Sequence, residues 1–132
     1  MFSKDVLIGL FIGIANCRVA IETSHRSTLG YRITPEIEIR GELMFLKQIE
    51  RALLQHSVKC HIKEIDSKLR QKPILTITRI KDLVIISDMI PLEFFDARTQ
   101  WFSFRTVINI MYEKRHLTLK GFDEILKIKG LI

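Results

Sequence analysis

Hydrophobic and polar positions follow two different periods in the first third of the chain. Residues 4–16 are apolar on nearly every side of a helix, which is typical of a helix that is buried all round. Apolar and polar residues then alternate, which predicts strands at 17–23 and 31–40 with a polar loop at 24–30 between them. Pro35 lies inside the second strand, so we expect that strand to be bulged or to lie at a sheet edge.

The rest of the chain repeats helix and hairpin and then ends in helices. The predicted elements are, in chain order, a helix at 42–56, strands at 59–65 and 74–80, and helices at 81–90, 97–115 and 119–131. Thr118 is the expected N-cap of the last helix. This order predicts an α+β fold, with residues 1–132 as a single domain. Its αββαββα core has a four-stranded antiparallel sheet with one open face, and further C-terminal helices follow.

Two glycines interrupt the first predicted helix. Gly9 and Gly13 each lower helix stability by roughly 1 kcal/mol relative to alanine. Because they are four residues apart, they share one face, where the missing Cβ lets another backbone approach closely. We therefore expect this helix to pair with a second copy of the chain or with another protein. The candidate pairing residues are Leu7, Gly9, Leu10, Ile12, Gly13 and Ile14.

The charge of the chain favours a polyanionic partner. Twenty-one Lys and Arg against fifteen Asp and Glu give a net charge of +6. Residues 59–81 hold seven basic and two acidic side chains, and seven minus two places +5 of that charge in one predicted hairpin. Nucleic acid is the first candidate partner and an anionic membrane surface the second.

The open sheet face and the two hairpin loops are the candidate nucleic-acid surface. Lys and Arg at the rim suit phosphates, and polar side chains on the strands suit base edges or riboses. Glu22, Glu36 and Glu38 lie on the same predicted face and repel phosphates, so a merely solvated face is the alternative. The candidate binding residues are Arg18, His25, Arg26, Arg32, Arg40, Lys59, His61, Lys63, Lys68, Arg70, Lys72, Thr76 and Thr78.

Several other classes of site are not expected. Cys17 and Cys60 are too few for a disulfide framework, and no histidine has metal-ligand spacing, so we expect neither a metal nor a cofactor. Cys60 and His61 are adjacent on a strand and point to opposite faces, so they cannot form a catalytic pair.

The apolar run at 6–15 is about half the roughly 20 residues that span a bilayer, so no membrane insertion is expected. An aromatic stripe at Trp101, Phe102 and Phe104 is more typical of a core than of a base-stacking platform.

Three stretches of the chain carry a resemblance to a known family. The first is the helix segment Leu7-Ile8-Gly9-Leu10-Phe11-Ile12-Gly13-Ile14-Ala15; the others are Gly30–Pro35 and the tail 116–129. With the order of elements, they make residues 5–130 resemble the LAGLIDADG homing endonucleases. The resemblance implies paired motif helices, a saddle of four strands facing nucleic acid, and a homodimer for a chain with one motif. Members cut DNA at intron insertion sites, some are RNA maturases or other binding proteins, and many are encoded in organelles.

The sequence departs from the family pattern where metal chemistry is required. The metal-binding acid of the family is the eighth motif residue, which is Ile14 here, and isoleucine offers no oxygen ligand to a divalent cation. Gly41 stands where a glutamine often follows the second strand. Asn16 is a neutral amide, and Asp5 lies at the wrong end of the helix. We therefore expect no nuclease activity.

These features together predict a catalytically inactive LAGLIDADG-like protein that binds structured RNA in an organellar ribonucleoprotein, as a ribosomal protein or an intron-splicing cofactor. An RNA recognised by its shape tolerates mixed charges on the sheet better than base-by-base reading of DNA does. The alternative is a DNA-binding degenerate endonuclease or regulator. Isoleucine occurs 21 times and alanine four times, as expected of an AT-rich coding sequence. We therefore expect a mitochondrion before a chloroplast, with the cytoplasm of a low-GC microbe as the alternative.

Overall fold

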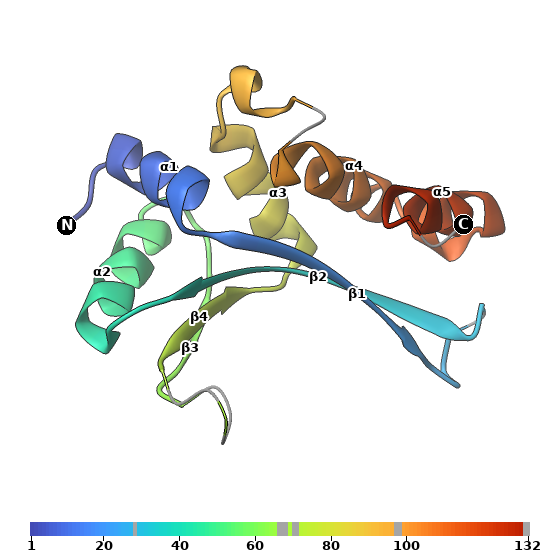
Figure 1. The fold of residues 1–132 in the computed structure, drawn as a ribbon, viewed down its shortest axis with the longest axis horizontal. Coiled ribbons are helices and arrows are strands. Elements are labelled where there is room, and N and C mark those ends of the chain that lie inside the picture. Colours follow the sequence, from blue (N-terminus) through green and yellow to red (C-terminus); the bar gives the residue numbers. More distant parts are fainter. Residues whose placement is uncertain (28, 66–68, 70–71, 97–98, 131–132) are drawn as a thin grey trace.

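The computed structural model describes residues 1–27, 29–65, 69, 72–96 and 99–130. Helices and strands follow one another in the predicted order (Figure 1). Their bounds are α1 (Lys4–Gly13), β1 (Asn16–Thr23), β2 (Tyr31–Arg40), α2 (Leu43–Leu54), β3 (His61–Lys63), β4 (Ile74–Ile77), α3 (Ile80–Met89), α4 (Gln100–Tyr112) and α5 (Leu119–Ile128). Two short 3₁₀ turns, η1 (Leu92–Phe94) and η2 (Arg115–Leu117), precede α4 and α5.

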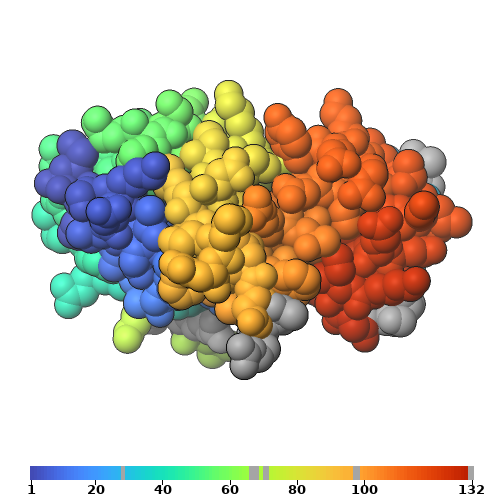
Figure 2. All heavy atoms as spheres, turned by 90° about the horizontal axis from the view of Figure 1, so that it is seen from above, coloured from blue at the N-terminus to red at the C-terminus, as the bar shows by residue number. Residues whose placement is uncertain are grey.

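The four strands form one antiparallel sheet in the order β1-β2-β4-β3. The helices lie on one side of this sheet, and the opposite face is open (Figure 1). Seen from the helical side, α1, the α3 region, α4 and α5 follow one another across the molecule (Figure 2). This arrangement confirms the predicted α+β fold with its four-stranded antiparallel sheet.

Pro35 does not mark an edge strand or a bulge, so that expectation is wrong. β2 is an inner strand, and its register with β1 runs unbroken over eight residue pairs. However, β4 pairs with β2 only between Ile37 and Arg40. At Pro35 the strand therefore has a neighbour on one side alone. Its missing N–H faces the unpaired side and costs no hydrogen bond of the sheet.

The strands of the second hairpin are shorter than predicted. β4 ends at Ile77 because α3 begins at Ile80, one residue earlier than the sequence indicates. Arg79 is the N-cap of α3, and its Nε lies 2.7 Å from Oδ2 of the buried Asp82. This ion pair, three residues apart, favours the helix start. Thr78 lies between β4 and α3, outside the strand.

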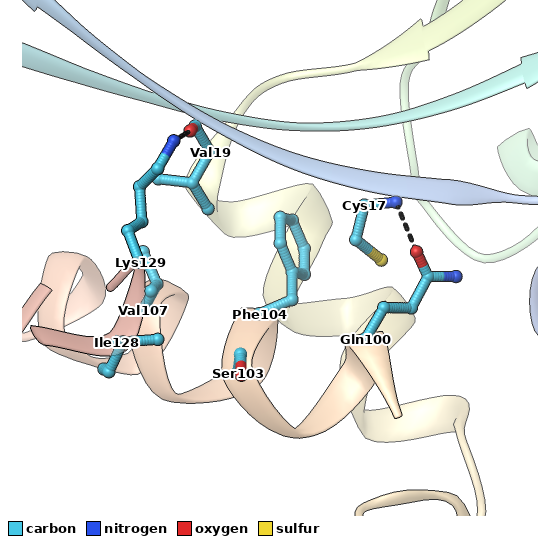
Figure 3. Close-up of a pocket in the computed structure, with 8 residues that line it drawn as sticks. All are labelled: Cys17, Val19, Gln100, Ser103, Phe104, Val107, Ile128 and Lys129. Carbon is cyan, nitrogen blue, oxygen red and sulfur yellow. Dashed lines mark hydrogen bonds between the residues drawn. The ribbon is translucent and has the colours of Figure 1, made fainter. Parts of the chain in front are cut away.

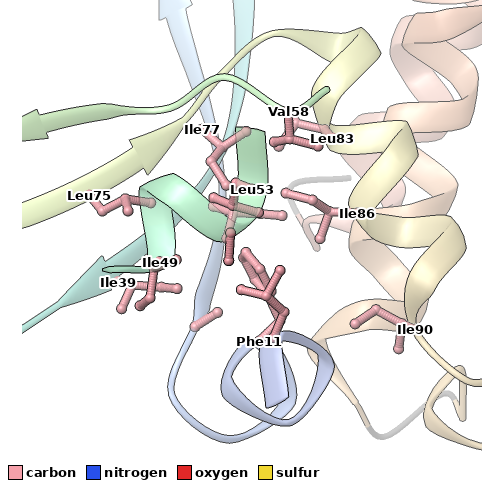
Figure 4. Packing of buried hydrophobic residues seen from close by; sticks show 14 of the residues in the cluster. Phe11, Ile39, Ile49, Leu53, Val58, Leu75, Ile77, Leu83, Ile86 and Ile90 are labelled. Atoms are coloured by element: carbon pink, nitrogen blue, oxygen red, sulfur yellow. The ribbon is translucent and has the colours of Figure 1, made fainter. Parts of the chain in front are cut away.

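A main core lies between α1, α2, α3 and the sheet (Figure 4). Its fully buried side chains include Phe11, Leu53, Leu75 and Ile86. A second cluster, centred on Ile125, joins α4 and α5 to β2. Trp101 and Phe104 belong to the main core, which confirms the prediction for these two aromatic residues, whereas Phe102 is 44% exposed.

α1 is not buried all round, contrary to the prediction from its composition. Leu7 and Phe11 are its buried residues and face the main core. Gly9 and Gly13 are exposed, and a Cβ built on either of them meets no atom within 4 Å. Leu7 therefore cannot belong to a pairing surface, because its side chain is used by the core of the same chain.

Gly121 lets α5 pack against the backbone of η2 more closely than a residue with a Cβ would allow. Thr118 caps α5 as predicted, its Oγ1 accepting a hydrogen bond from the Gly121 N–H at 3.1 Å. A Cβ on Gly121 would lie 1.9 Å from the carbonyl oxygen of Arg115 in η2. Since that oxygen belongs to the backbone, the turn and the helix would have to separate.

We predict that Gly121→Ala lowers the free energy of unfolding by about 1–3 kcal/mol, the usual cost of forced overpacking. Urea denaturation followed by circular dichroism measures this change. The matched control is Gly9→Ala, measured at protein concentrations at which α1 is unpaired; there it places the same methyl group in open space and should raise helix stability by about 0.5–1 kcal/mol. Equal effects of the two variants would contradict the close packing of η2 on α5.

Candidate nucleic-acid interface

The strand register decides which side chains reach the open face. Ile37 and Ile39 of β2 point into the main core, so the residues that alternate with them point to the other face. One row across all four strands consists of Asn16, Glu38, Thr76 and His61. The open face is therefore lined by polar and charged side chains on every strand.

Arginine and glutamate neutralise one another across the first hairpin. Arg32 Nη2 lies 3.2 Å from Glu22 Oε2, and the two residues are direct partners in the register. Arg18 Nη1 lies 3.4 Å from Glu36 Oε1 and 3.9 Å from Glu38 Oε2. The Arg32–Glu22 pair is exposed, so it adds little to stability. The main effect of these ion pairs is to neutralise the negative charge of the glutamates, which the sequence alone predicts would repel phosphates.

The open face carries little net charge of its own. Its cations Arg18, Arg32, Arg40 and Lys63 stand against Glu22, Glu36 and Glu38, and four minus three gives +1. Further cations lie at the rim: Arg26 in the β1–β2 loop, Lys59 before β3 and Lys72 before β4 are all exposed. A ligand on this face would meet paired, polar groups at the centre and a mainly positive edge, at which the exposed Glu64 follows Lys63.

The predicted binding residues divide by where the structure places them. Six lie on strands of the open face: Arg18, Arg32, Arg40, His61, Lys63 and Thr76. Five lie at the rim and outside the strands: His25, Arg26, Lys59, Lys72 and Thr78. Lys68 and Arg70 lie outside the described residues. The strands and rims thus bring most of the predicted set to one side of the sheet.

The end of α1 offers poor chemistry for a divalent cation. Ile14 follows the last helical residue and is 48% exposed. The nearest polar side chain along the chain, Asn16, donates a hydrogen bond from Nδ2 to Glu38 Oε1 at 3.2 Å. Within the described ranges, no three His, Cys, Asp or Glu side chains are grouped so as to hold a metal ion. At the motif position itself Ile14 offers no oxygen ligand, and the nearby Glu38 carboxylate is engaged by Asn16 and Arg18.

Gly41, the other departure from the family pattern, has a packing role. It follows β2, and a Cβ at this position would lie 3.0 Å from the Phe45 ring. Phe45 packs against the main core and stacks edge-on against Phe2, with ring centroids 6.1 Å apart. Glycine is therefore well suited to the turn from β2 into α2.

Two residues far along the chain hold the outer edge of β1 (Figure 3). Gln100 of α4 accepts a hydrogen bond from the Cys17 N–H at 2.9 Å and donates one to the Ala15 carbonyl at 2.8 Å. Lys129 donates to the Val19 carbonyl. These contacts cover backbone groups that an edge strand otherwise exposes to another chain. No local pattern in the sequence indicates them, because the partners are 83 to 110 residues apart.

The two cysteines lie in settings that suppress their reactivity. Burial raises the pKa of Cys17 to about 12. Burial, and then the charge of Glu50, raise the pKa of Cys60 to about 12 as well. Both thiols are free and partly buried. They stay protonated at neutral pH, and a thiol rather than a thiolate is a poor nucleophile.

The arrangement of elements matches solved structures of homing endonucleases. I-TnaI superposes with a TM-score of 0.74 and 20% sequence identity, over 96% of this chain and 85% of that one. The LAGLIDADG meganuclease I-CpaMI bound to uncleaved DNA superposes with a TM-score of 0.77 and 24% identity, over 98% of this chain and 43% of that one. An archaeal intron-encoded homing endonuclease complexed with DNA superposes with a TM-score of 0.78 and 18% identity, over 95% and 78%.

The chain has the LAGLIDADG fold. This confirms the resemblance inferred from the motif helix, the second strand and the tail. No protein-family model matches the sequence, and no curated protein matches it either. The chain spans less than half the length of I-CpaMI. Along the part of the chain that the structure describes, no helix is both long and apolar enough to cross a membrane.

We predict that Gln100→Ala lowers the free energy of unfolding by about 1–2 kcal/mol, because it removes two hydrogen bonds, one from the Cys17 N–H in β1 and one to the Ala15 carbonyl just before β1, each with a net contribution of about 0.5–1.5 kcal/mol. Urea denaturation measures the change. The control is Gln55→Ala, an exposed glutamine after α2 whose loss should stay within about 0.5 kcal/mol. If the two variants unfold alike, Gln100 does not hold the edge of β1.

Proposed function

We propose that this chain is a catalytically inactive LAGLIDADG-like protein that binds structured RNA. The observation that carries the proposal is a contrast within one structure. The open four-stranded face and its basic rim are present, whereas Ile14 occupies the motif position at which a metal ligand is required. A surface that keeps its polar and basic groups but lacks the metal ligand suits binding without cleavage.

Nucleic acid is favoured as the ligand for two reasons. I-CpaMI and the archaeal endonuclease, which share the fold, are described as bound to DNA. Arg26, Lys63 and Lys72 are exposed cations with no ion pair to the described residues, and they lie at the ends and loops of the strands, where they are available to phosphates. The row with Thr76 and His61 offers uncharged polar groups between those edges.

RNA is favoured over DNA by the near-neutral centre of the face. Since Arg18 and Arg32 are engaged by glutamates, they are poorly placed to read guanine edges in a duplex. Folded RNA is recognised through shape, phosphates and riboses, which the rim cations and hydroxyls can contact. The competing function is a DNA-binding degenerate endonuclease or regulator, and the DNA complexes of the structural neighbours are the observation in its favour.

We further propose that the glycine face of α1 pairs with a second copy of the chain. The face is apolar and uncovered: Val6 is 46% and Ile14 48% exposed, and the space beside Gly9 and Gly13 is open. Of the predicted pairing set, Gly9, Gly13 and Ile14 remain as the centre of the surface. Leu10 and Ile12 lie at its border, because both are half-buried against the main core.

The cellular setting stays a prediction from composition. We propose an organellar ribonucleoprotein, a ribosomal protein or a splicing cofactor, in a mitochondrion rather than a chloroplast. A low-GC microbial cytoplasm is the alternative. A protein partner on the glycine face of α1 would be compatible with either setting.

The proposed function predicts tighter binding of a structured intron RNA than of duplex DNA in a gel-shift titration over a salt series. Replacing Lys59, Lys63 and Lys72 by alanine should weaken RNA binding by roughly ten-fold or more. The salt slope should fall by about 1 for each phosphate that a lysine no longer neutralises. The control replaces Lys47, Lys120 and Lys127 of α2 and α5, which keeps the net charge of the two variants equal.

Three outcomes of this titration would contradict the proposal. Equal loss of affinity in both triple variants would mean that net charge, not the rim, drives binding. Preferential duplex DNA binding would favour the competing function. Magnesium-dependent cleavage of either nucleic acid during the assay would show that the chain is a nuclease after all.

Pairing through α1 predicts that Gly13→Leu raises the dissociation constant of the dimer about ten-fold or more in sedimentation velocity, because a side chain now fills the space between the two backbones. The fold should be unaffected, since the position opens onto free space. Lys47→Leu on α2 is the control for an added exposed leucine. An unchanged monomer–dimer equilibrium in the Gly13 variant would show that this face is not the pairing surface.

A further inference from the structure

A concave pocket, called here the hairpin-tip pocket, lies behind the tip of the β1–β2 hairpin. It has a volume of about 330 Å³ and is formed by the β1–β2 loop, the start of β2, η2 and α5. Ile33 and Phe122, which line it, belong to the second hydrophobic cluster beneath α5. The site is therefore on the helical side of the sheet, away from the open face but joined to it by the hairpin tip.

An aromatic ring forms one wall of this hairpin-tip pocket. The rings of Tyr31 and Phe122 are stacked, with centroids 5.5 Å apart and planes 21° from parallel. Phe122 is only 7% exposed, whereas Tyr31 is 46% exposed. The tyrosine ring is thus supported from one side by a buried ring and remains accessible. A ring held in this way is a suitable platform for a nucleobase, since stacking requires little further ordering.

The polar groups of the pocket suit the rest of a nucleotide. Arg26 is exposed and makes no ion pair with the described residues, and Ser24 and Ser27 contribute hydroxyl groups beside it. The other arginine in the lining, Arg32, is engaged by Glu22. The described lining residues include no carboxylate. A pocket with one free guanidinium and no carboxylate among its described lining residues favours a phosphate group as ligand.

His116 of η2 also lines this pocket. Its Nδ1 is buried and has no hydrogen-bond partner among the described residues. Burial lowers the pKa of His116, so the imidazole is neutral at pH 7 and can act as donor or acceptor. A buried polar atom without a partner among the described residues is unfavourable.

We propose that this hairpin-tip pocket binds one unpaired nucleotide of the RNA, with its base on Tyr31 and its phosphate at Arg26. The inference rests on the proposed function. A base that is paired in a helix lying on the open face cannot reach the opposite side of the sheet. A single-stranded extension that passes the hairpin tip can, because Arg26 lies in the loop between the two faces. The pocket would therefore select RNAs with an unpaired segment next to a folded one.

The test compares two RNAs that differ only in a single-stranded extension. One is a blunt stem-loop, and the other is the same stem-loop with a short extension that carries the fluorescent base 2-aminopurine. The wild-type chain should bind the extended RNA more tightly and quench its fluorescence by stacking. Tyr31→Leu should lose about five-fold or more in affinity for the extended RNA, abolish the quenching and leave blunt binding unchanged.

Three further variants separate stacking from general effects. Tyr31→Phe keeps the ring and should retain both affinity and quenching. Tyr112→Leu removes a 61%-exposed tyrosine from α4 and should have no effect. Arg26→Ala alters only an exposed loop side chain, so it tests the pocket even if Tyr31→Leu unfolds. It should weaken binding of the extended RNA by more than it weakens binding of the blunt RNA, and the salt slope should fall by about 1 more for the extended RNA.

The outcomes distinguish this inference from the proposed function. If the blunt RNA binds but the extension adds neither affinity nor quenching, the pocket is not a nucleotide site and the proposed function stands. Wild-type behaviour of both Tyr31→Leu and Arg26→Ala would overturn the pocket in the same way. If neither RNA binds, the proposed function fails, and the inference fails with it.

Discussion

The register between β1 and β2 is the constraint on which the rest of the structure depends. It places Cys17 and Val19 opposite Ile37 and Pro35 on the helical side, and it leaves the intervening arginines and glutamates on the open side. Because side chains alternate along a strand, a shift of one residue would exchange the two faces. It would expose the isoleucines of β2 and bury charged groups, so hydrophobic burial holds the register and the register defines the candidate binding face.

A consequence of this register is that charge is distributed unevenly over the candidate interface. Opposite charges meet across β1 and β2, which leaves the centre of the sheet polar and nearly neutral. Among the described residues, the exposed rim cations outside such pairs, Arg26, Lys59 and Lys72, lie in loops and before strands. Such a distribution would let phosphates bind along the edges of the sheet and uncharged groups bind at its centre.

The apolar helix α1 combines two roles that composition cannot separate. Leu7 and Phe11 pack into the core of the chain, while Gly9 and Gly13 stay exposed one half-turn away. All four are compatible with a helix that is apolar all round, which is why the sequence pattern by itself places Leu7 on the wrong surface. The side that is buried internally depends on where α2 and the sheet lie, and that information comes from segments distant in sequence.

Local periodicity in the sequence determined the order of elements, the α+β class and the alternation of the strands, because each of these follows from neighbouring residues alone. The capping of α5 by Thr118 was predictable for the same reason. Only the tertiary structure decided the arginine–glutamate pairs, the support of β1 by Gln100 and the stacking of Tyr31 on Phe122. Each of these joins residues from different elements. Such contacts form because the core brings the elements together, and no local pattern encodes the distances that result.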